Sequence, residues 1–335
     1  MIVAGTLLIL LSMLWVCPAL AIRAPPRERV RQGLAAAWGG FGLVAIALLW
    51  ITGSALAFAA YAVALAVVLG WWFSLRPSQD RAWAEDVACL LRGEVHGSTV
   101  TLHNLRNFRW HGPSASTPRW ESRDYDLDTL ASVDVALSYW MGPAIAHTLV
   151  CFGFTNGEHL AFSIEIRKKH GEKFSAIGGL FRQFEASLVA ADERDILAVR
   201  TNQRGEDVYL YRVAMPQAAM RSLFLAYVAK ADELAHAPRF YNTFTANCTT
   251  VVYEMVRRII DGLPLDYRLL ASGYLPDYLL KVEGLVPGHT LDELRAAGRI
   301  TDRARTAGDA TDFSARIRQG VPGYDAAGRP VPLEE

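Results

Sequence analysis

The residue best suited to covalent chemistry in this chain is a cysteine at the start of an expected helix. Cys248 follows the polar, turn-favouring residues 242–247 and precedes an apolar pattern of helical spacing that runs to about Asp261. Asn247 or Thr245 is a natural N-cap, which places Cys248 in the first helical turn. Amides and the helix dipole favour negative charge there, and the thiolate is the nucleophilic form of cysteine. Cys248 is therefore a candidate nucleophile, although a lone cysteine is more often a packing residue.

A cysteine nucleophile needs a base, and the chain has eight histidines. His147 differs from the others because it lies near the start of a strongly patterned strand, residues 145–154. The other histidines lie in polar segments or flank the following strand. An isolated histidine in a strand is more often structural, so the interpretation depends on what lies opposite it.

Two strands, residues 145–154 and 159–168, are predicted to form a hairpin. Both have a strand-like apolar pattern, and Asn156 and Gly157 stand between them. An Asn-Gly pair between two such runs is the strongest short-range hairpin signal. The hairpin brings a second set of polar residues beside His147.

The register of this hairpin depends on the loop. A three-residue loop with Gly157 in the left-handed conformation produces a G1 bulge. The pairs counted back from that loop are Cys151 with Ala161, Leu149 with Ser163, and His147 with Glu165. Glu165 would then orient the imidazole and raise its basicity. A two-residue turn pairs His147 with Ile166 instead and leaves Glu165 on the other face, as an ordinary salt-bridge partner.

Two dense charge runs, residues 165–169 and 191–195, are typical of solvated faces. Arg167 shares a strand face with Glu165. It is therefore also a candidate for contacting a phosphate or carboxylate of a substrate.

The N-terminal part of the chain predicts a membrane anchor. Residues 1–22 and 34–75 carry no charge, and each stretch is long enough for one or more spans. We expect two or three transmembrane helices in residues 1–75, at about 3–22, 34–52 and 54–75, with a tight turn at residues 52–54. Trp71, Trp72 and Phe73 form an expected interfacial aromatic belt.

The basic stretch Arg23–Gly33 bears on orientation. The positive-inside rule places it in the cytoplasm, and with three spans the C-terminal part would then lie there too. With two spans, or with this loop outside, the C-terminal part is external.

The remainder of the chain predicts an α+β domain with an antiparallel sheet. A connector, residues 76–99, contains a short helix at 80–92. The domain spans residues 100–265 and is followed by a helical extension, 266–335, with a disordered tail. Further strands are expected at 100–110, 132–140, 187–191 and 207–213, and helices at 178–185 and 217–236.

Composition and motifs exclude several classes of protein. The net charge is zero, so nothing indicates nucleic-acid binding. The four cysteines lack zinc-site spacing. The chain contains neither a Gly-rich phosphate loop nor an H-E-x-x-H motif. We expect no metal and no cofactor.

Many short motifs in a fixed order resemble the Lnb-type N-terminal periplasmic domain family, over about residues 80–262. They are N-L-R-N-F (104–108), T-P-R-W-E (117–121), Y-D-L (125–127), S-Y-W (138–140), A-H-T (146–148), F-S-I-E-I-R-K (162–168), G-L-F-R-Q-F-E (179–185), A-D-E-R-D (191–195), R-T-N (200–202), D-V-Y-L-Y (207–211) and N-C-T-T (247–250). The characterised namesake of that family is a bacterial lipoprotein N-acyltransferase.

This resemblance implies a papain-like α+β fold in the permuted, NlpC-like order, with the histidine strand before the cysteine helix. It also implies a multi-pass protein of the bacterial inner membrane whose catalytic domain faces the periplasm, against the charge rule. Asn247, Arg167 and Tyr139 are expected as supporting or substrate-binding residues.

The resulting hypothesis is a membrane-anchored thiol acyltransferase with Cys248, His147 and Glu165 as its catalytic residues. A membrane phospholipid would be the acyl donor, and an amine, such as the N-terminal cysteine of a lipoprotein, the acceptor. Amides at the start of the Cys248 helix would hold the oxyanion. Two alternatives stay open: a cysteine hydrolase of peptide or amide bonds in the cell envelope, and a non-catalytic, membrane-tethered binding module.

Overall fold

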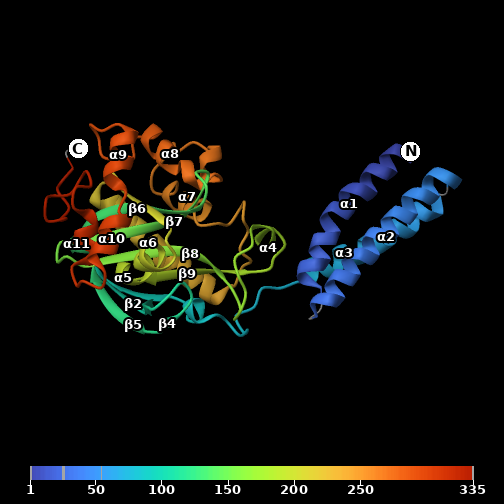
Figure 1. The fold of residues 1–335 in the computed structure, drawn as a ribbon, viewed down its shortest axis with the longest axis horizontal. Coiled ribbons are helices and arrows are strands. Elements are labelled where there is room, and N and C mark those ends of the chain that lie inside the picture. Colours follow the sequence, from blue (N-terminus) through green and yellow to red (C-terminus); the bar gives the residue numbers. More distant parts are fainter. Residues whose placement is uncertain (1, 25–26, 54, 334–335) are drawn as a thin grey trace. The chain divides into compact units, whose positions relative to one another are not determined.

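The computed structural model describes residues 2–24, 27–53 and 55–333 of the chain. These residues form two compact units (Figure 1). The first unit comprises residues 1–80 and two later segments, 174–185 and 239–243; the second comprises residues 81–173, 186–238 and 244–335.

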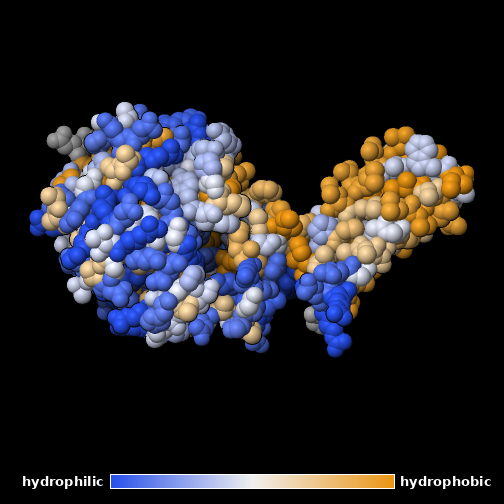
Figure 2. All heavy atoms as spheres, in the orientation of Figure 1, coloured by the Kyte–Doolittle hydropathy of each residue, from blue (hydrophilic) through white to orange (hydrophobic). Residues whose placement is uncertain are grey.

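Within the described residues, three long helices make up most of the first unit. They are α1 (Ile2–Arg23), α2 (Glu28–Thr52) and α3 (Ala55–Ser74). Each is long and apolar enough to cross a membrane, and Figure 2 shows apolar surface over them. The expected break before α3 is confirmed, because α2 ends at Gly53 in the left-handed conformation, with φ of 62°. α2 begins earlier than expected, at Glu28, so part of the basic stretch is helical.

A later segment of the chain packs on α3 within this unit. The Phe181 ring lies 6.2 Å from the Trp72 ring, and the Arg182 guanidinium lies 4.7 Å above the same indole. Arg182 also donates to the Trp72 backbone carbonyl at 2.8 Å. Trp72 is therefore buried by protein, whereas its neighbour Phe73 is exposed. Of the residues of the expected aromatic belt, Trp72 therefore packs against protein, whereas Phe73 lies at the surface.

The described part of the second unit contains an eight-stranded mixed sheet with the order β1-β2-β9-β8-β7-β6-β10 and with β5 also paired to β2. β2 pairs with β9 in parallel, at Arg106 and Ala191. The α+β class is confirmed, while the expectation of a purely antiparallel sheet is wrong. The strands of this sheet are β1 (Arg92–His96), β2 (Thr99–Arg106), β5 (Trp120–Asp126), β6 (Leu130–Met141), β7 (Ile145–Phe154), β8 (His159–Arg167), β9 (Glu185–Ala191) and β10 (Asp207–Arg212). The short strands β3 (Arg109–Trp110) and β4 (Ser116–Thr117) form a separate two-stranded sheet.

The helices of this part of the chain are mostly short. The long one, α6, spans Gln217–His236, as expected from its amphipathic pattern. The others are α5 (Glu193–Ile196), α7 (Thr250–Val256), α8 (Leu275–Lys281), α9 (Leu291–Gly298), α10 (Thr301–Ala307) and α11 (Phe313–Arg318), while α4 (Ala176–Leu180) belongs to the first unit.

The β7–β8 hairpin adopts the register of the three-residue loop. Gly157 has φ of 85°, and the Phe154 N–H donates to the Glu158 carbonyl at 3.0 Å. The ladder pairs include Cys151 with Ala161 and Leu149 with Ser163. The prediction for these pairs is confirmed. His147 and Glu165 lie two residues beyond the last ladder pair of these strands, Leu149 with Ser163.

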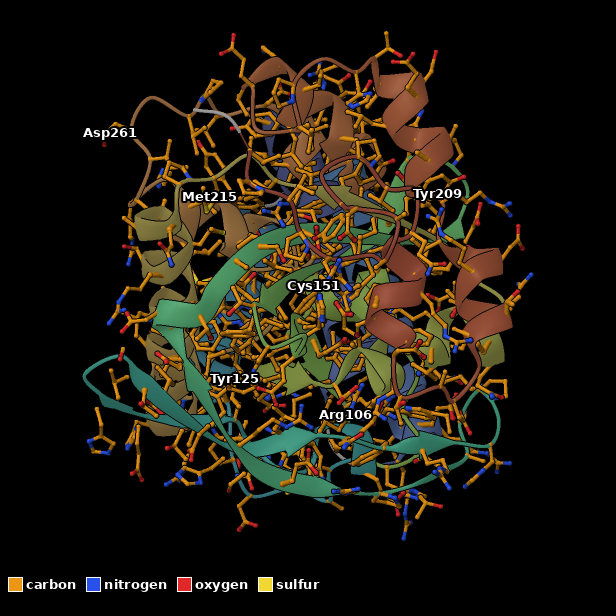
Figure 3. All side chains as sticks on the ribbon, turned by 90° about the vertical axis from the view of Figure 1, so that its left-hand side faces the viewer. Arg106, Tyr125, Cys151, Tyr209, Met215 and Asp261 are labelled. Carbon is orange, nitrogen blue, oxygen red and sulfur yellow. The ribbon has the colours of Figure 1, made fainter. Side chains whose placement is uncertain are left out.

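Alternating side chains of β7 enter two separate cores. Val150 and Phe152 pack on one face in a cluster that includes Phe224 of α6. Leu149 and Cys151 pack on the other face in a second cluster, and Figure 3 shows Cys151 in the interior among the strands. Because both faces are covered, β7 is a nearly continuous apolar run, in which His147 stands out.

The expected helix at residues 80–92 is wrong. The connector contains a three-residue 3-10 turn, Glu85–Val87, and β1 begins at Arg92. Arg167 donates to the Val87 and Ala88 carbonyls at 3.0 and 2.6 Å. These contacts use backbone groups that a helix would need for itself, so tertiary structure overrides local preference.

The acidic run 191–195 is buried instead of solvated. Asp195 is fully buried and accepts two hydrogen bonds from Arg106, at 2.9 and 3.0 Å. Glu193 is also fully buried. The family motifs around Arg106 and the acidic run therefore form an internal ion pair, which secures the junction of β2 and β9.

The C-terminal residues differ from the expected disordered tail. Arg318, at the end of α11, is fully buried and donates to Asp134 of β6 at 2.8 Å and to Glu193 at 2.7 Å. Tyr324 donates to the same Asp134 at 2.5 Å. The polar composition that predicted disorder serves a buried ion-pair cluster instead.

Candidate active site

The turn before α7 is organised by Asn247. Its Oδ1 accepts hydrogen bonds from the N–H groups of Thr249 and Thr250, at 2.9 and 2.8 Å. Asn247 thus forms a turn of the kind that its residue type favours, but the residue that caps α7 is Thr249, and the side chain of Thr249 makes no capping hydrogen bond. Cys248 lies in this turn, two residues before the first helical residue, so the expectation that it falls in the first helical turn is wrong; α7 also ends at Val256, earlier than expected. Two of the amides at the helix start, where an oxyanion was expected to bind, are engaged by Asn247.

Cys248 has an environment that favours its thiolate. It is 8% exposed, and the charge of the nearby His147 imidazole acts on its thiol. The Thr249 hydroxyl lies 3.9 Å from Sγ. Burial raises the pKa of the Cys248 thiol, but the charge and hydrogen bond of His147, with the contributions of Thr148 and Thr249, outweigh it and lower the pKa. A lowered pKa increases the thiolate fraction at neutral pH.

His147 is held on the opposite side of its ring by two residues of β8. Its Nε2 lies 2.7 Å from Ser163 Oγ and 3.2 Å from Glu165 Oε1. Burial and the Arg200 charge lower the pKa of His147, but Glu165 and Cys248 raise it more, so that the pKa rises to about 9. The imidazole is therefore protonated at neutral pH beside a thiol that readily ionises.

Glu165 provides the negative charge behind the imidazole. It accepts hydrogen bonds from Ser163 Oγ at 2.8 Å and from Arg200 Nη2 at 3.2 Å. Burial raises the pKa of Glu165, but His147, Arg200 and Ser163 lower it well below its usual range. The carboxylate is thus ionised and fixed by three partners.

A second carboxylate extends this polar network. Arg200 also donates to Glu206 Oε2 at 3.2 Å, and Ser138 donates to the same oxygen. Ser138 pairs with His147 in the β6–β7 ladder. The contacts of Glu206 therefore reach β6, the strand that pairs with the strand of His147.

Arg167 lies apart from this network. Besides its bonds to the connector carbonyls, its guanidinium stacks on Trp83 at 4.4 Å, and the side chain is buried. These contacts give Arg167 the role of an anchor for the connector. They leave its expected substrate contact without support from the geometry.

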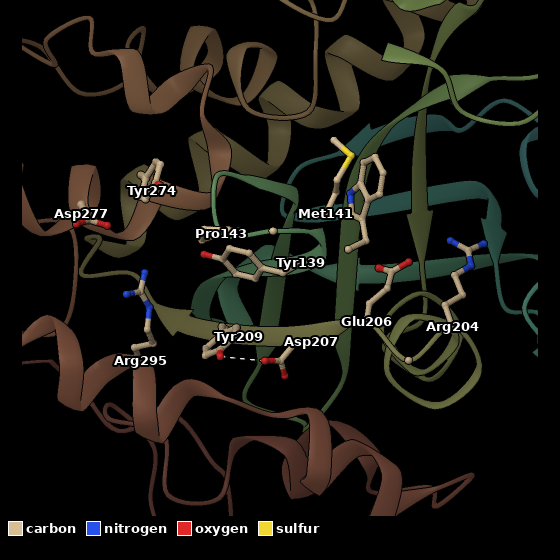
Figure 4. Close-up of a pocket in the computed structure, with 13 residues that line it drawn as sticks. Tyr139, Met141, Pro143, Arg204, Glu206, Asp207, Tyr209, Tyr274, Asp277 and Arg295 are labelled. Carbon is tan, nitrogen blue, oxygen red and sulfur yellow. Dashed lines mark hydrogen bonds between the residues drawn. The ribbon is translucent and has the colours of Figure 1, made fainter.

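Tyr139 lines a cavity of about 620 Å³. Its hydroxyl donates to the Gly273 carbonyl at 2.6 Å. Figure 4 shows its ring beside Tyr209, with Arg295 on one side and Glu206 on the other. Because Glu206 also binds Arg200, this cavity adjoins the network of the candidate site. Its lining residues are Tyr139, Trp140, Met141, Gly142, Pro143, Arg204, Gly205, Glu206, Asp207, Tyr209, Tyr274, Asp277 and Arg295.

Sequence reasoning missed three residues of the cluster. Ser163 is the ladder partner of Leu149, so the hairpin register alone could have indicated it. Arg200 lies in a π-helical turn, Val199–Gln203, and its motif carried no sign of a role. Thr148 contacts the cysteine turn through its hydroxyl, which lies 2.9 Å from the Thr249 hydroxyl, and no local pattern predicts a contact between segments so far apart in the sequence.

Across residues 2–24, 27–53 and 55–333, no group of three or more His, Cys, Asp or Glu side chains is placed to hold a metal ion.

Fold and site together define a membrane-anchored α+β protein with a Cys–His–carboxylate cluster. The family model of the Lnb N-terminal periplasmic domain matches residues 116–273. The matched residues include Cys248, His147 and Glu165. No curated protein and no solved structure matches the chain.

The family assignment also bears on location. A periplasmic domain family together with three apolar helices describes a membrane-anchored protein with a periplasmic domain. The family thus favours the side opposite to the one that the charge rule gave for a three-span anchor.

Proposed function

We propose that this protein is a thiol acyltransferase of the bacterial inner membrane, with Cys248 as nucleophile. The observation that supports it best is the contact between a thiol of lowered pKa and an imidazole whose pKa is raised to about 9. In such a pair the cysteine nucleophile is ionised, and the protonated imidazole can donate a proton during the reaction. The ionised Glu165 behind the ring makes the arrangement a complete nucleophile–base–orienter set.

The first half-reaction acylates the enzyme. The Cys248 thiolate attacks the ester carbonyl of a membrane phospholipid, so that a carbon–sulfur bond forms and the carbon–oxygen bond to the lysophospholipid breaks. His147 gives its proton to the departing alcohol oxygen. Since Ser163 and Glu165 occupy Nε2, Nδ1 is the nitrogen that serves this transfer.

The second half-reaction transfers the acyl group to an amine, for which we propose the N-terminal cysteine of a lipoprotein. The amine nitrogen attacks the thioester carbonyl, the carbon–sulfur bond breaks, and His147 accepts the amine proton. Donor and acceptor both reside in the membrane, which a multi-pass anchor suits.

We also propose that the domain is a permuted papain-like fold. His147 on a strand precedes Cys248 at a helix start, which is the order that this arrangement requires.

The test uses a bacterial host that lacks its own lipoprotein N-acylation. Wild type, Cys248→Ala and Cys89→Ala are expressed, and lipoprotein N-terminal peptides are analysed by mass spectrometry. Cys89 is the matched control because its thiol is only partly buried and burial raises its pKa. We expect an added acyl chain with wild type and Cys89→Ala only.

Other outcomes separate the alternatives. No added chain with any protein, together with a reactive Cys248, moves the assignment to a hydrolase. Equal acylation by wild type and Cys248→Ala removes Cys248 from the mechanism. An inert Cys248 favours a binding module.

A further inference from the structure

An apolar cavity of about 230 Å³ lies between the sheet and helices α6, α7 and α8. Its walls are aliphatic and aromatic, except for two threonines and one glutamate. The lining residues are Val133, Val135, Thr148, Val150, Val213, Ala214, Met215, Leu223, Thr249, Val252, Tyr253, Val256, Ile260, Leu263, Leu269, Leu275, Tyr278, Leu279, Val282, Glu283 and Gly284. Figure 3 labels one of them, Met215, beside the helices that close the cavity.

The tyrosines of the wall present carbon and not oxygen to the cavity. The Tyr253 hydroxyl donates to the Leu263 carbonyl at 2.9 Å, and the Tyr278 hydroxyl donates to the Pro264 carbonyl at 3.1 Å. Both polar ends are thus satisfied by the same loop. The cavity therefore suits an apolar occupant and offers a water molecule few partners.

The two threonines place the cavity next to the nucleophile. The Thr249 hydroxyl lies 3.9 Å from the Cys248 sulfur, and Thr148 contributes to lowering the pKa of that thiol. The two hydroxyls bond each other at 2.9 Å, so they satisfy one another without a ligand. Both residues also belong to the cavity wall. One pair of side chains thus separates the reacting sulfur from an apolar space.

We infer that this cavity binds the hydrocarbon chain of the acyl group carried by Cys248. The inference rests on the proposed function and adds to it a location for the chain. In the acyl-enzyme the carbonyl carbon is bonded to sulfur, so the chain must leave from a point within a few ångströms of the two threonines. The cavity is the apolar volume that adjoins this point.

The size of the cavity sets the length of chain that it can hold. A protein cavity of about 150 Å³ binds benzene; at the same packing, 230 Å³ holds about nine carbon atoms. A longer chain must project beyond it. Glu283 is exposed, so the cavity approaches solvent at this residue, which is where the remainder of a long chain would emerge.

The experiment measures how Cys248 reacts with alkyl methanethiosulfonates of increasing length, methyl, butyl, octyl and dodecyl. The thiolate attacks the reagent sulfur, an alkyl disulfide forms, and methanesulfinate leaves. Only a reactive thiol is required, with no acyl donor or acceptor. Each methylene that enters an apolar site favours reaction by up to about fourfold, so we expect the octyl reagent to react at least about tenfold faster than the methyl reagent.

Three variants locate the effect. Val252→Phe fills the cavity from α7 and should lower the octyl-to-methyl ratio to near one. Leu279→Ala enlarges it from α8 and should move the preference toward dodecyl. Val251→Phe is the matched control, because Val251 precedes Val252 on the same helix and is not part of the cavity wall. It should keep the wild-type ratio.

The outcomes test the proposed nucleophile and the proposed chain-binding cavity separately. A Cys248 that reacts with none of the reagents overturns the proposed function. A reactive Cys248 whose rates do not depend on chain length, or a ratio that Val252→Phe and Leu279→Ala leave unchanged, overturns the chain-binding cavity while leaving the nucleophile intact. If Val251→Phe lowers the ratio as much as Val252→Phe, the effect belongs to the helix and the cavity assignment fails.

Discussion

Arg200 Nη2 lies 3.2 Å from Glu165 Oε1, and this contact joins the carboxylate behind His147 to a π-helical turn. The guanidinium also pairs with Glu206. Its charge lowers the pKa of both Glu165 and His147. Arg200 therefore keeps Glu165 ionised while it limits how strongly the imidazole holds its proton.

The pH dependence of Cys248 alkylation tests the thiolate–imidazolium pair. Because the pKa of Cys248 is lowered and that of His147 is about 9, iodoacetamide should react rapidly already at pH 7. In His147→Ala, burial acts without the compensating cation, so the profile should move to higher pH. Each unit of pKa changes the thiolate fraction about tenfold. Peptide mass spectrometry gives the rates, and identical profiles for the two proteins would contradict the pairing.

Glu165→Gln should move the alkaline limb of the activity profile. Loss of the carboxylate removes the charge that raises the pKa of His147, so the limb near pH 9 should shift to lower pH and the rate should fall about 100-fold. Glu206→Gln is the control, because it binds Arg200 and leaves Glu165 in place. A lower rate with an unmoved limb would indicate a purely structural role for Glu165.

The hairpin loop predicts a cost for adding a side chain at Gly157. Its φ of 85° is a conformation that residues other than glycine adopt with strain, so Gly157→Ala should lower the free energy of unfolding by about 1 kcal/mol. Gly112→Ala, at a position without positive φ, should change it little. Urea unfolding of both variants measures the difference, and equal stability would show that the loop tolerates the change.

Arg318→Met should destabilise the domain strongly. It leaves Asp134 and Glu193 buried without a cation, which costs about 3–5 kcal/mol. Arg316→Met, which removes an exposed pair with Asp312, should change stability by less than about 0.5 kcal/mol. Thermal or urea unfolding provides the comparison.

The same cluster predicts an acid transition. Burial raises the pKa of Glu193, but Arg318 outweighs it and lowers the pKa from 4.5 to about 2. A carboxylate with a depressed pKa stabilises the fold above its unfolded value, and this contribution disappears as the pH falls from about 4.5 toward 2. Wild type should lose this increment over that range, and Arg318→Met should lack it. Parallel pH–stability curves would contradict the assignment.

Local signals were enough to predict much of the site. Strand periodicity and the Asn-Gly loop gave the register that brings Glu165 behind His147, and the residue type of Asn247 indicated a side chain that accepts hydrogen bonds from backbone amides in the turn before α7. These features depend on residues near one another in sequence or on one hairpin. Cys248 was placed near His147 by chemical reasoning and family likeness, because no local pattern encodes a contact between such distant segments.

Long-range ion pairs account for what local signals could not predict. Residues 191–195 look solvated because their partners, Arg106 and Arg318, lie far away in the sequence. The sequence of the connector has a helical pattern, but Arg167 binds two of its backbone carbonyls and a helix does not form there. In each case a buried charged residue contacts a partner that is distant in the sequence. Hydropathy patterns predict charged residues at the surface, so they do not predict such contacts.

The Arg318 cluster also has a consequence for biogenesis. Asp134 and Arg318 are 184 positions apart, and chains emerge and begin to fold from the N-terminus. Strand β6, which lies between β7 and the edge strand β10, is therefore synthesised long before its counter-ion. The buried charge of Asp134 can be paired only once residue 318 has been made, so this part of the sheet reaches its native state late.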